Sequence, residues 1–191
     1  MSASNTFRLA CVFVSLLAFA PPQALLAQEE DDVFAFIPDG GRTLLERLIE
    51  NGLSPGVQAE ITSQSRNAEG WATFLAEKSA DNPLIADLDE YQTQTLASYL
   101  SYNMPLEAGE ELPWDGRDMA LERCQSCHII TVVVTQDRTR EHWLGTMHTP
   151  SHIEVPLTEA EREELADYLV LNGGIPIDDV PPALRAGGAS Y

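Results

Sequence analysis

The five residues Cys124-Gln125-Ser126-Cys127-His128 decide how the rest of the chain is interpreted. Two cysteines three positions apart lie on one face of a helical turn, so both thiols can reach one edge of a flat cofactor. A histidine directly after the second cysteine can then offer a neutral imidazole nitrogen to a metal at the centre of that cofactor. The spacing is typical of covalent haem attachment, with Cys124 and Cys127 as anchors and His128 as the proximal iron ligand.

Other chemistry that uses a C-x-x-C pair fits this chain less well. A tetrahedral zinc site needs further ligands, and the chain offers His142, His148 and His152 but no second cysteine pair. A thioredoxin-like pair would belong to a βαβ unit, whereas the flanks of this motif have helical spacing. A structural disulfide between the two cysteines is an alternative in an oxidising compartment, but it leaves the histidine of the motif without a role.

The first 27 residues have the pattern of a secretory signal peptide. Arg8 is the only charged residue among them, and an apolar run from Leu9 to Ala20 precedes a small residue, Ala27. The run is shorter than a membrane span requires, so we expect cleavage near Gln28 and no stable span afterwards; a retained N-terminal anchor is the alternative. Cleavage also removes the third cysteine and leaves the motif cysteines without a further disulfide partner.

The chain carries a formal net charge of −19 at pH 7. Such an acidic surface disfavours nucleic acid and anionic lipid as partners. It favours a redox partner with a basic docking patch and an association rate that depends on salt. The alternative is that the acidity only keeps the protein in solution.

Apolar spacing predicts an all-α fold. Helices are expected at residues 42–51, 68–79, 88–103, 116 to the cysteine motif, 140–146 and 158–172. Asp89 with Gln92, and Thr158 with Glu161, have the spacing of capping boxes at two of these helices. In the last helix the leucines and Tyr168 should face inward, whereas the glutamates and Arg162 should face water.

Pro55 is predicted to break the chain after the first helix, and Pro83 to end the segment at residues 68–79. Residues 129–134 are rich in β-branched side chains, which favours an extended segment. The tail, residues 175–191, is rich in proline and glycine and should be irregular. We expect it to lie against the body through three apolar residues: Ile177, Val180 and Leu184.

Two parts of the chain match each other. Five residues recur 69 positions later: Leu88, Leu96, Tyr99, Leu100 and Asn103 correspond to Leu157, Leu165, Tyr168, Leu169 and Asn172. Arg66 and Trp71 recur 72 positions later as Arg138 and Trp143. We therefore expect a duplicated unit, with a haemless first copy at residues 28–105 and a haem-binding second copy at residues 106–174. The alternative is that two amphipathic helices resemble each other by chance.

The second copy, about residues 114–174, resembles the class I cytochrome c family. The resemblance rests on Gly116, on the cysteine motif, and on the closing helix with Leu165-Ala166-Asp167-Tyr168-Leu169. The order of an Arg, a Trp and a Met before this helix is similar to small cytochrome subunits of periplasmic dehydrogenases. The resemblance implies a monohaem c-type cytochrome in the periplasm, with one covalent haem c and terminal helices that cross near it.

The ligand on the far side of the iron has several candidates. Met147 lies one helical turn after Trp143, and Met opposite His is a common pair in electron-transfer haems, so we predict Met147. His152 and His148 are alternatives, and Met104 could serve only if the first copy folds over the haem. Only 18 residues separate His128 from Met147, which is short for the family that the chain resembles.

The resemblance implies electron transfer, from a dehydrogenase to a cytochrome or an oxidase, and no catalytic residue is predicted. We expect an exposed haem edge flanked by Trp114, Ile129 and Ile130. One alternative is a five-coordinate haem enzyme or gas sensor, with a histidine on its open side. Another is that the haemless copy docks a larger catalytic partner. The sequence has no Gly-rich phosphate loop, HExxH motif or Ser-His-Asp pattern.

Overall fold

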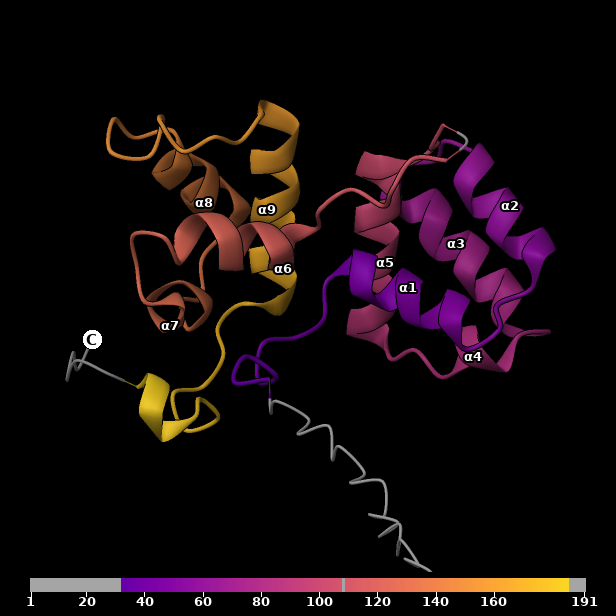
Figure 1. Ribbon diagram of the computed structural model, residues 1–191, viewed down its shortest axis with the longest axis horizontal. Coiled ribbons are helices and arrows are strands. Elements are labelled where there is room, and N and C mark those ends of the chain that lie inside the picture. Colours follow the sequence, from indigo (N-terminus) through magenta and orange to yellow (C-terminus); the bar gives the residue numbers. More distant parts are fainter. Residues whose placement is uncertain (1–31, 108, 186–191) are drawn as a thin grey trace, which may run out of the picture. The chain divides into compact units, whose positions relative to one another are not determined.

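The computed structural model describes residues 32–107 and 109–185, so the predicted signal peptide lies outside the described residues. Within these ranges the chain folds into helices and contains no strand, which confirms the all-α prediction. None of the helices in these ranges is both long and apolar enough to cross a bilayer. The helices gather around two apolar cores (Figure 1).

The first core is enclosed by α1 (Gly41–Glu50), α2 (Pro55–Ser63), α3 (Ala68–Ser79), α4 (Pro83–Ala86) and α5 (Glu90–Asn103). Its largest buried side chains are Trp71, Phe74 and Tyr99. The rings of Trp71 and Phe74 meet edge to face, with centroids 5.4 Å apart. We call α1–α5 the first half.

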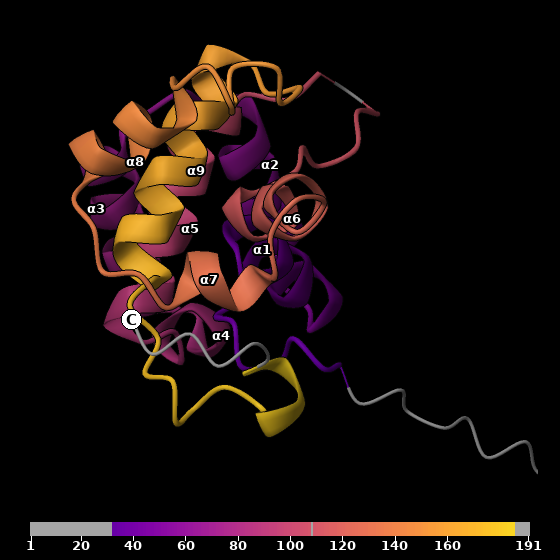
Figure 2. The ribbon, with the colours of Figure 1, turned by 90° about the vertical axis from the view of Figure 1, so that its left-hand side faces the viewer.

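The second core is enclosed by α6 (Gly116–Met119), the π-helical turn η1 (Ala120–Cys124), α7 (Ile130–Val134), α8 (Arg140–Met147) and α9 (Glu159–Asn172). Helix α9 packs on α6 and α8, and its other side contacts α5 (Figure 2). We call these elements the second half.

Both predicted capping boxes are confirmed. The Asp89 carboxylate accepts a hydrogen bond from the backbone N–H of Gln92, and the hydroxyl of Thr158 accepts one from Glu161. The side chains of Gln92 and Glu161 reach back to the backbone N–H of the capping residues. Each cap satisfies N–H groups that the first helical turn leaves free, and each typically stabilises the fold by about 1 kcal/mol.

The prediction of an extended segment at residues 129–134 is wrong, because Ile130–Val134 form α7. Ile130, Val133 and Val134 are buried in the second core at helical spacing, and this packing outweighs the preference of β-branched residues for strands. The predicted breaks at Pro55 and Pro83 are boundaries between helices, because α1 ends before Pro55 and α3 ends before Pro83. Each proline also follows a capping residue and opens the next helix, where its missing N–H costs nothing.

Two residues of α9 that were expected to face water are buried. Arg162 and Glu164 are each 5 % exposed. The expectation assumed that α9 has one apolar face, whereas this helix packs against neighbours on two sides. The water-facing prediction for these two side chains is therefore wrong.

The segments before the first helix of each half cross to the other half. We call residues 32–40 the first arm and residues 109–115 the second arm. Ile37 of the first arm is buried in the second core, and Leu112 of the second arm packs against the first core. The second core therefore contains a side chain from the arm that precedes the first half, and the first core is covered by one from the arm that precedes the second half.

Two tyrosines fasten the arms in matching ways. The Tyr168 hydroxyl of α9 donates to the carbonyl of Pro38 at 2.6 Å, and the Tyr99 hydroxyl of α5 donates to the carbonyl of Pro113 at 3.0 Å. Between α5 and α9, the Asn103 amide donates to Glu164 Oε1 at 3.0 Å. The corresponding Asn172 amide donates to the Thr95 hydroxyl at 2.9 Å. The contacts between the halves are thus exchanged in reciprocal pairs.

The tail docks on α7 through backbone atoms. The N–H of Ile175 donates to the carbonyl of Val134 at 3.1 Å, and the Thr131 hydroxyl donates to the carbonyl of Leu184 at 2.9 Å. Leu184 ends a short 3₁₀ turn, Pro182–Leu184. Val180 is buried and Leu184 half-buried, as expected, but Ile177 is exposed and the prediction for it is wrong.

Candidate functional site

A widened helical turn presents the cysteine motif. In η1 the N–H of Gln125 donates to the carbonyl of Ala120, five residues back, at 3.2 Å. The N–H of His128 then donates to the carbonyl of Cys124 at 2.9 Å. Single π-helical turns inside α-helices are frequent at functional sites. Here the turn places both thiols and the imidazole within one loop of backbone.

This loop forms one wall of a cavity of about 460 Å³. The size lies within the range of roughly 300–1,000 Å³ that is usual for small-molecule and cofactor sites. Cys124, Cys127 and His128 face the cavity, and Met147 and His152 line it too. Apolar side chains from α7, α8, α9 and the segment before α9 complete the lining: Val132, Val133, Trp143, Val155, Leu157, Leu165 and Leu169.

The two thiols are free and not joined in a disulfide. Cys127 is exposed and Cys124 is half-buried. Burial, with a smaller contribution from Cys127, raises the pKa of the Cys124 thiol to about 11. Cys124 is therefore a neutral S–H group at physiological pH, with a neighbouring thiol three residues away on the same cavity wall.

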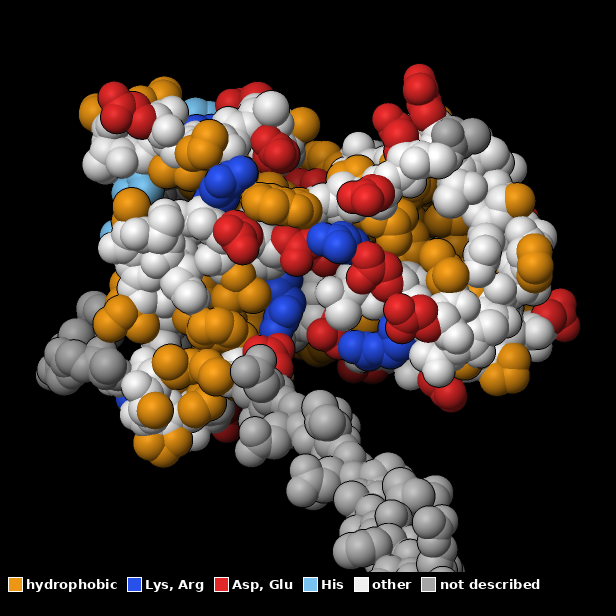
Figure 3. Space-filling model, in the orientation of Figure 1, with side chains coloured by type: hydrophobic (Ala, Val, Ile, Leu, Met, Phe, Trp, Pro, Cys, Tyr) orange, Lys and Arg blue, Asp and Glu red, His pale blue; other side chains and the backbone are white. Residues whose placement is uncertain are grey.

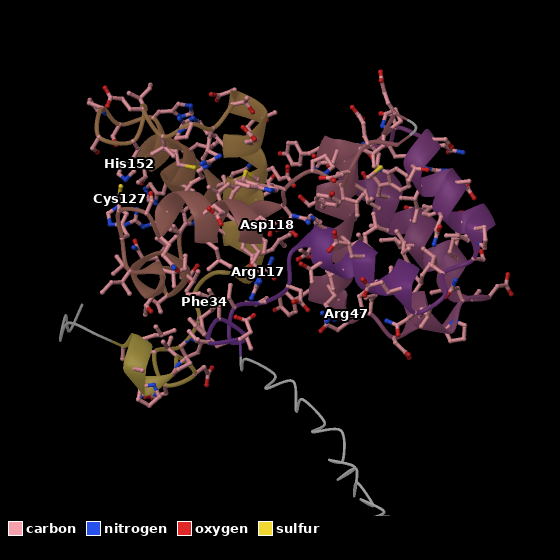
Figure 4. The ribbon with its side chains drawn as sticks, in the orientation of Figure 1. Phe34, Arg47, Arg117, Asp118, Cys127 and His152 are labelled. Atoms are coloured by element: carbon pink, nitrogen blue, oxygen red, sulfur yellow. The ribbon has the colours of Figure 1, made fainter. Side chains whose placement is uncertain are left out.

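His128 and His152 face each other at the cavity. Their ring centroids lie 5.9 Å apart, with the ring planes 21° from parallel. His152 and Cys127, both labelled in Figure 4, line this cavity. Nδ1 of His152 lies 2.9 Å from the Thr149 hydroxyl and 3.0 Å from the Ser151 hydroxyl, so these residues orient the imidazole.

The structure separates the three candidates for the distal ligand. Met147 is buried and lines the cavity together with His152. His148 does not line the cavity. Its Nδ1 lies 2.8 Å from the carbonyl of Leu144 and its Nε2 lies 3.1 Å from both oxygens of Glu159, whose carboxylate raises the pKa of His148. Both ring nitrogens of His148 are therefore engaged on the protein surface.

Nitrogen donors at the cavity fit a cofactor that carries carboxylates. The indole N–H of Trp143 and Nε of Arg123 are buried without a hydrogen-bond partner among the described residues, and both side chains line the cavity. The guanidinium of Arg138 lies 5.1 Å from the ring centroid of Trp143. Buried donors of this kind normally have partners, and arginines pair well with carboxylates such as the two on a haem.

Sequence reasoning named Arg138 and Trp143 in the repeat and in the order of residues before the last helix, but it did not name Arg123. The signal it missed is that the chain has only 11 Lys and Arg residues, and Arg123 directly precedes the motif. Because basic residues are so few, an arginine directly before the cysteine motif is a candidate site residue.

The residues predicted to flank an exposed edge are only partly exposed. Trp114 is 40 % and Ile129 46 % exposed, but Ile130 is buried in the second core, so the prediction for Ile130 is wrong. Ile129 lines a separate surface groove of about 400 Å³ beside Cys127 and His128. Phe34 of the first arm and Leu184 of the tail form its other walls.

Two leucines of the first half precede the candidate ligands at offsets close to that of the repeat. Leu53 lies 75 positions before His128, and Leu75 lies 72 positions before Met147. They are 2 % and 1 % exposed and belong to the first core. The first core is therefore built from side chains where the second half has a cavity.

The cavity of the second half brings together two thiols, an imidazole opposite a second imidazole, a thioether, and unpartnered N–H donors. This set can bind a flat metal-containing cofactor covalently at one edge and offer metal ligands to both of its faces. Comparison with protein-family models, curated proteins and solved structures finds no match to this chain.

Proposed function

We propose that the protein is a monohaem c-type cytochrome that transfers electrons. The observation that carries the proposal is the 460 Å³ cavity with Cys124, Cys127 and His128 on one wall and with Met147 and His152 also in its lining. We further propose that residues 1–27 are removed as a signal peptide and that the mature chain works in the periplasm, where c-type haem is attached.

Each residue of the cavity has a separate task in this proposal. Cys124 and Cys127 would hold the haem through thioether bonds, and His128 would supply a nitrogen ligand to its iron. Trp143 and Arg138 would donate hydrogen bonds to its carboxylates, while the apolar lining would exclude water. When bound, haem c supplies a centre that gains and loses one electron.

Met147 is our proposed distal ligand, and His152 is the alternative. Both line the cavity, so either can complete six-coordinate iron from the protein. Met opposite His raises the potential and is a common arrangement in electron-transfer haems. His148, with both ring nitrogens engaged by Leu144 and Glu159, is not proposed as a ligand.

The proposed organisation is a duplicated unit, with residues 28–105 as a haemless copy, residues 106–174 as the haem-binding copy and residues 175–191 as a tail. The reciprocal arms support this organisation, because Pro38 and Pro113 stand 75 positions apart and meet Tyr168 and Tyr99. Contacts that recur in exchanged pairs support duplication over the alternative of a chance similarity between two helices.

The proposed partner is a periplasmic dehydrogenase, cytochrome or oxidase with a basic docking patch. Acidic side chains are spread over the face drawn in Figure 3, while Lys and Arg side chains gather in its middle. Arginines of α1 and α6 are engaged in ion pairs: Arg42 of α1 with Asp118, and Arg117 of α6 with Asp32. Basic groups near α1 and α6 are therefore neutralised, and the free charge of the surface is acidic.

Optical spectra of protein made with a haem-attachment system test the proposal. We expect covalently bound haem and, in the ferric state, the weak far-red charge-transfer band of Met ligation, which Met147→Ala abolishes and His148→Ala keeps. A low-spin spectrum without the band, changed by His152→Ala, would assign the distal position to His152.

A high-spin spectrum would favour the enzyme or sensor alternative. Absence of covalent haem would overturn the proposal, with the double substitution of Cys124 and Cys127 by Ser as the negative control.

A further inference from the structure

Arg162 is a buried cation whose partners are all backbone carbonyls. Its Nη1 donates to the carbonyl of Met147 at 2.8 Å. Its Nη2 donates to the carbonyls of Val155 at 2.9 Å and Ile153 at 3.3 Å. Among the described residues, no carboxylate lies within ion-pair distance of this guanidinium. The side chain is 5 % exposed and also lines the cavity.

These three carbonyls belong to one stretch, residues 147–155, which we call the distal segment. It starts at the last residue of α8 and continues through turns until shortly before α9. It carries both candidates for the distal ligand, Met147 and His152. Arg162 bonds the backbone of Met147 itself and the backbone on the far side of His152, so it spans the segment from end to end.

The energetics of this arrangement make Arg162 difficult to replace. A buried charge is costly unless hydrogen bonds compensate it, and hydrogen bonds to a charged donor are about twice as strong as neutral ones. Only the planar fork of a guanidinium holds several acceptors at fixed angles, which the single ammonium of Lys cannot do. Loss of the fork leaves the buried carbonyl of Met147 and the partly buried carbonyls of Ile153 and Val155 without these donors, which favours rearrangement of the segment.

We infer that Arg162 is a positioning residue that keeps Met147 at the cavity as the sixth ligand, by clamping the two ends of the distal segment. The role of Met147 as an iron ligand rests on the proposed function. The hydrogen bonds by which Arg162 holds the distal segment do not depend on haem. When the clamp is lost, the segment moves, Met147 leaves its position and His152 of the same segment takes its place.

The experiment compares wild type with Arg162→Gln and Arg162→Lys in the full chain, with Arg140→Gln as the matched control. Arg140 is an exposed arginine that pairs with Asp167 outside the cavity. In haem-loaded protein we expect Arg162→Gln to lose the Met-ligation band, remain low-spin, and shift to a lower reduction potential. We expect Arg162→Lys to keep part of the band, and Arg140→Gln to keep all of it. A wild-type band and potential in Arg162→Gln, with haem attached, would overturn the inference.

Hydrogen exchange separates this inference from the proposed function. In Arg162→Gln, amides of the distal segment should exchange at least about tenfold faster than in wild type, because bonds to a charged donor are lost. Amides of α3, in the first half, should be unchanged. The comparison is made with and without haem, so a protein that attaches no haem still tests the clamp. Equal exchange rates in the distal segment would overturn it.

Discussion

Glu164 is a carboxyl group buried where the two halves meet. Its Oε1 accepts a hydrogen bond from the amide of Asn103 at 3.0 Å, and the Asp115 carboxyl group is also close. Burial is the main cause that raises the pKa of Glu164, to about 8, and nearby carboxylates add to it. Glu164 is therefore a proton-carrying acid in the folded protein near neutral pH.

Glu164 should make the protein less stable as pH rises from about 5 to 8. The unfolded chain loses this proton near its ordinary pKa of 4.5, whereas the folded protein keeps it up to about pH 8. The folded state thus binds more protons in this window, and the free energy of unfolding falls with rising pH. Glu164→Gln stays neutral and keeps an oxygen for Asn103, so it should gain on the order of 1 kcal/mol or more relative to wild type at pH 8.

Urea denaturation at pH 5 and pH 8 measures this effect. The control is Glu163→Gln, because Glu163 is the neighbouring glutamate and its side chain is 44 % exposed. If wild type and Glu164→Gln lose stability equally between these pH values, Glu164 does not titrate as stated.

At the scale of the element, two glycines allow helices to cross in direct contact. A Cβ added at Gly116 of α6 would lie 2.1 Å from Cβ of Tyr168 on α9, and one at Gly41 of α1 would lie 2.1 Å from Cβ of Tyr99 on α5. Each crossing carries the tyrosine that fastens an arm of the other half. The α6–α9 crossing also sets where the cysteine motif begins.

Gly116→Ala should therefore destabilise the protein by about 1–3 kcal/mol or more, because α6 and α9 must separate to admit the methyl group. Gly145→Ala is the control. Gly145 lies in α8 with nothing within 4 Å of its added Cβ, so alanine there should stabilise the helix by about 0.5–1 kcal/mol. Chemical denaturation gives both values. Equal effects of the two substitutions would contradict the close crossing.

The helices that sequence predicts best are those with local side-chain caps. α3, α5 and α9 each begin with such a cap, and their bounds agree with the prediction to within two residues. Residues Ile130–Val134 were predicted to be extended because β-branched residues favour strands. Their helical conformation is determined by packing in the second core, which the propensity of single residues does not reflect. The burial of Arg162 was missed because it depends on acceptors in the distal segment, which come from another part of the chain.

The candidate site was predictable to the same extent. Residues close in sequence, Cys124, Cys127 and His128, carry their own geometry, so their joint place at one cavity wall follows from spacing. The choice between His148 and His152 does not follow from spacing. It depends on Glu159, which engages His148 at the surface and is fixed by the start of α9.

At the scale of the whole molecule, the reciprocal arms couple the two cores. Ile37 precedes the first half but is buried in the second core. Ile37→Ala should cost about 2–5 kcal/mol, as for other large-to-small core changes, and hydrogen exchange should speed up in α8 and α9 more than in α3. Val33→Ala, on the exposed part of the same arm, should have little effect. Faster exchange confined to α1–α5 would show that the arm belongs to the first half instead.

The net charge of −19 leads to a further prediction for the haem-loaded protein. Its rate of electron exchange with a small basic cytochrome should fall as ionic strength rises, because salt screens the attraction. With an acidic carrier the rate should rise instead. Stopped-flow mixing over a series of salt concentrations measures both rates. If the rate with the basic cytochrome does not change with ionic strength, the acidic surface does not take part in docking.

Leu53 and Leu75 help to fill a first core whose residues, including Leu112 of the second arm, all precede the cysteine motif in the chain. Because a chain is synthesised from its N-terminus, this core can form before the second half is complete. Ile37 then stays without its buried position until the second core assembles around it.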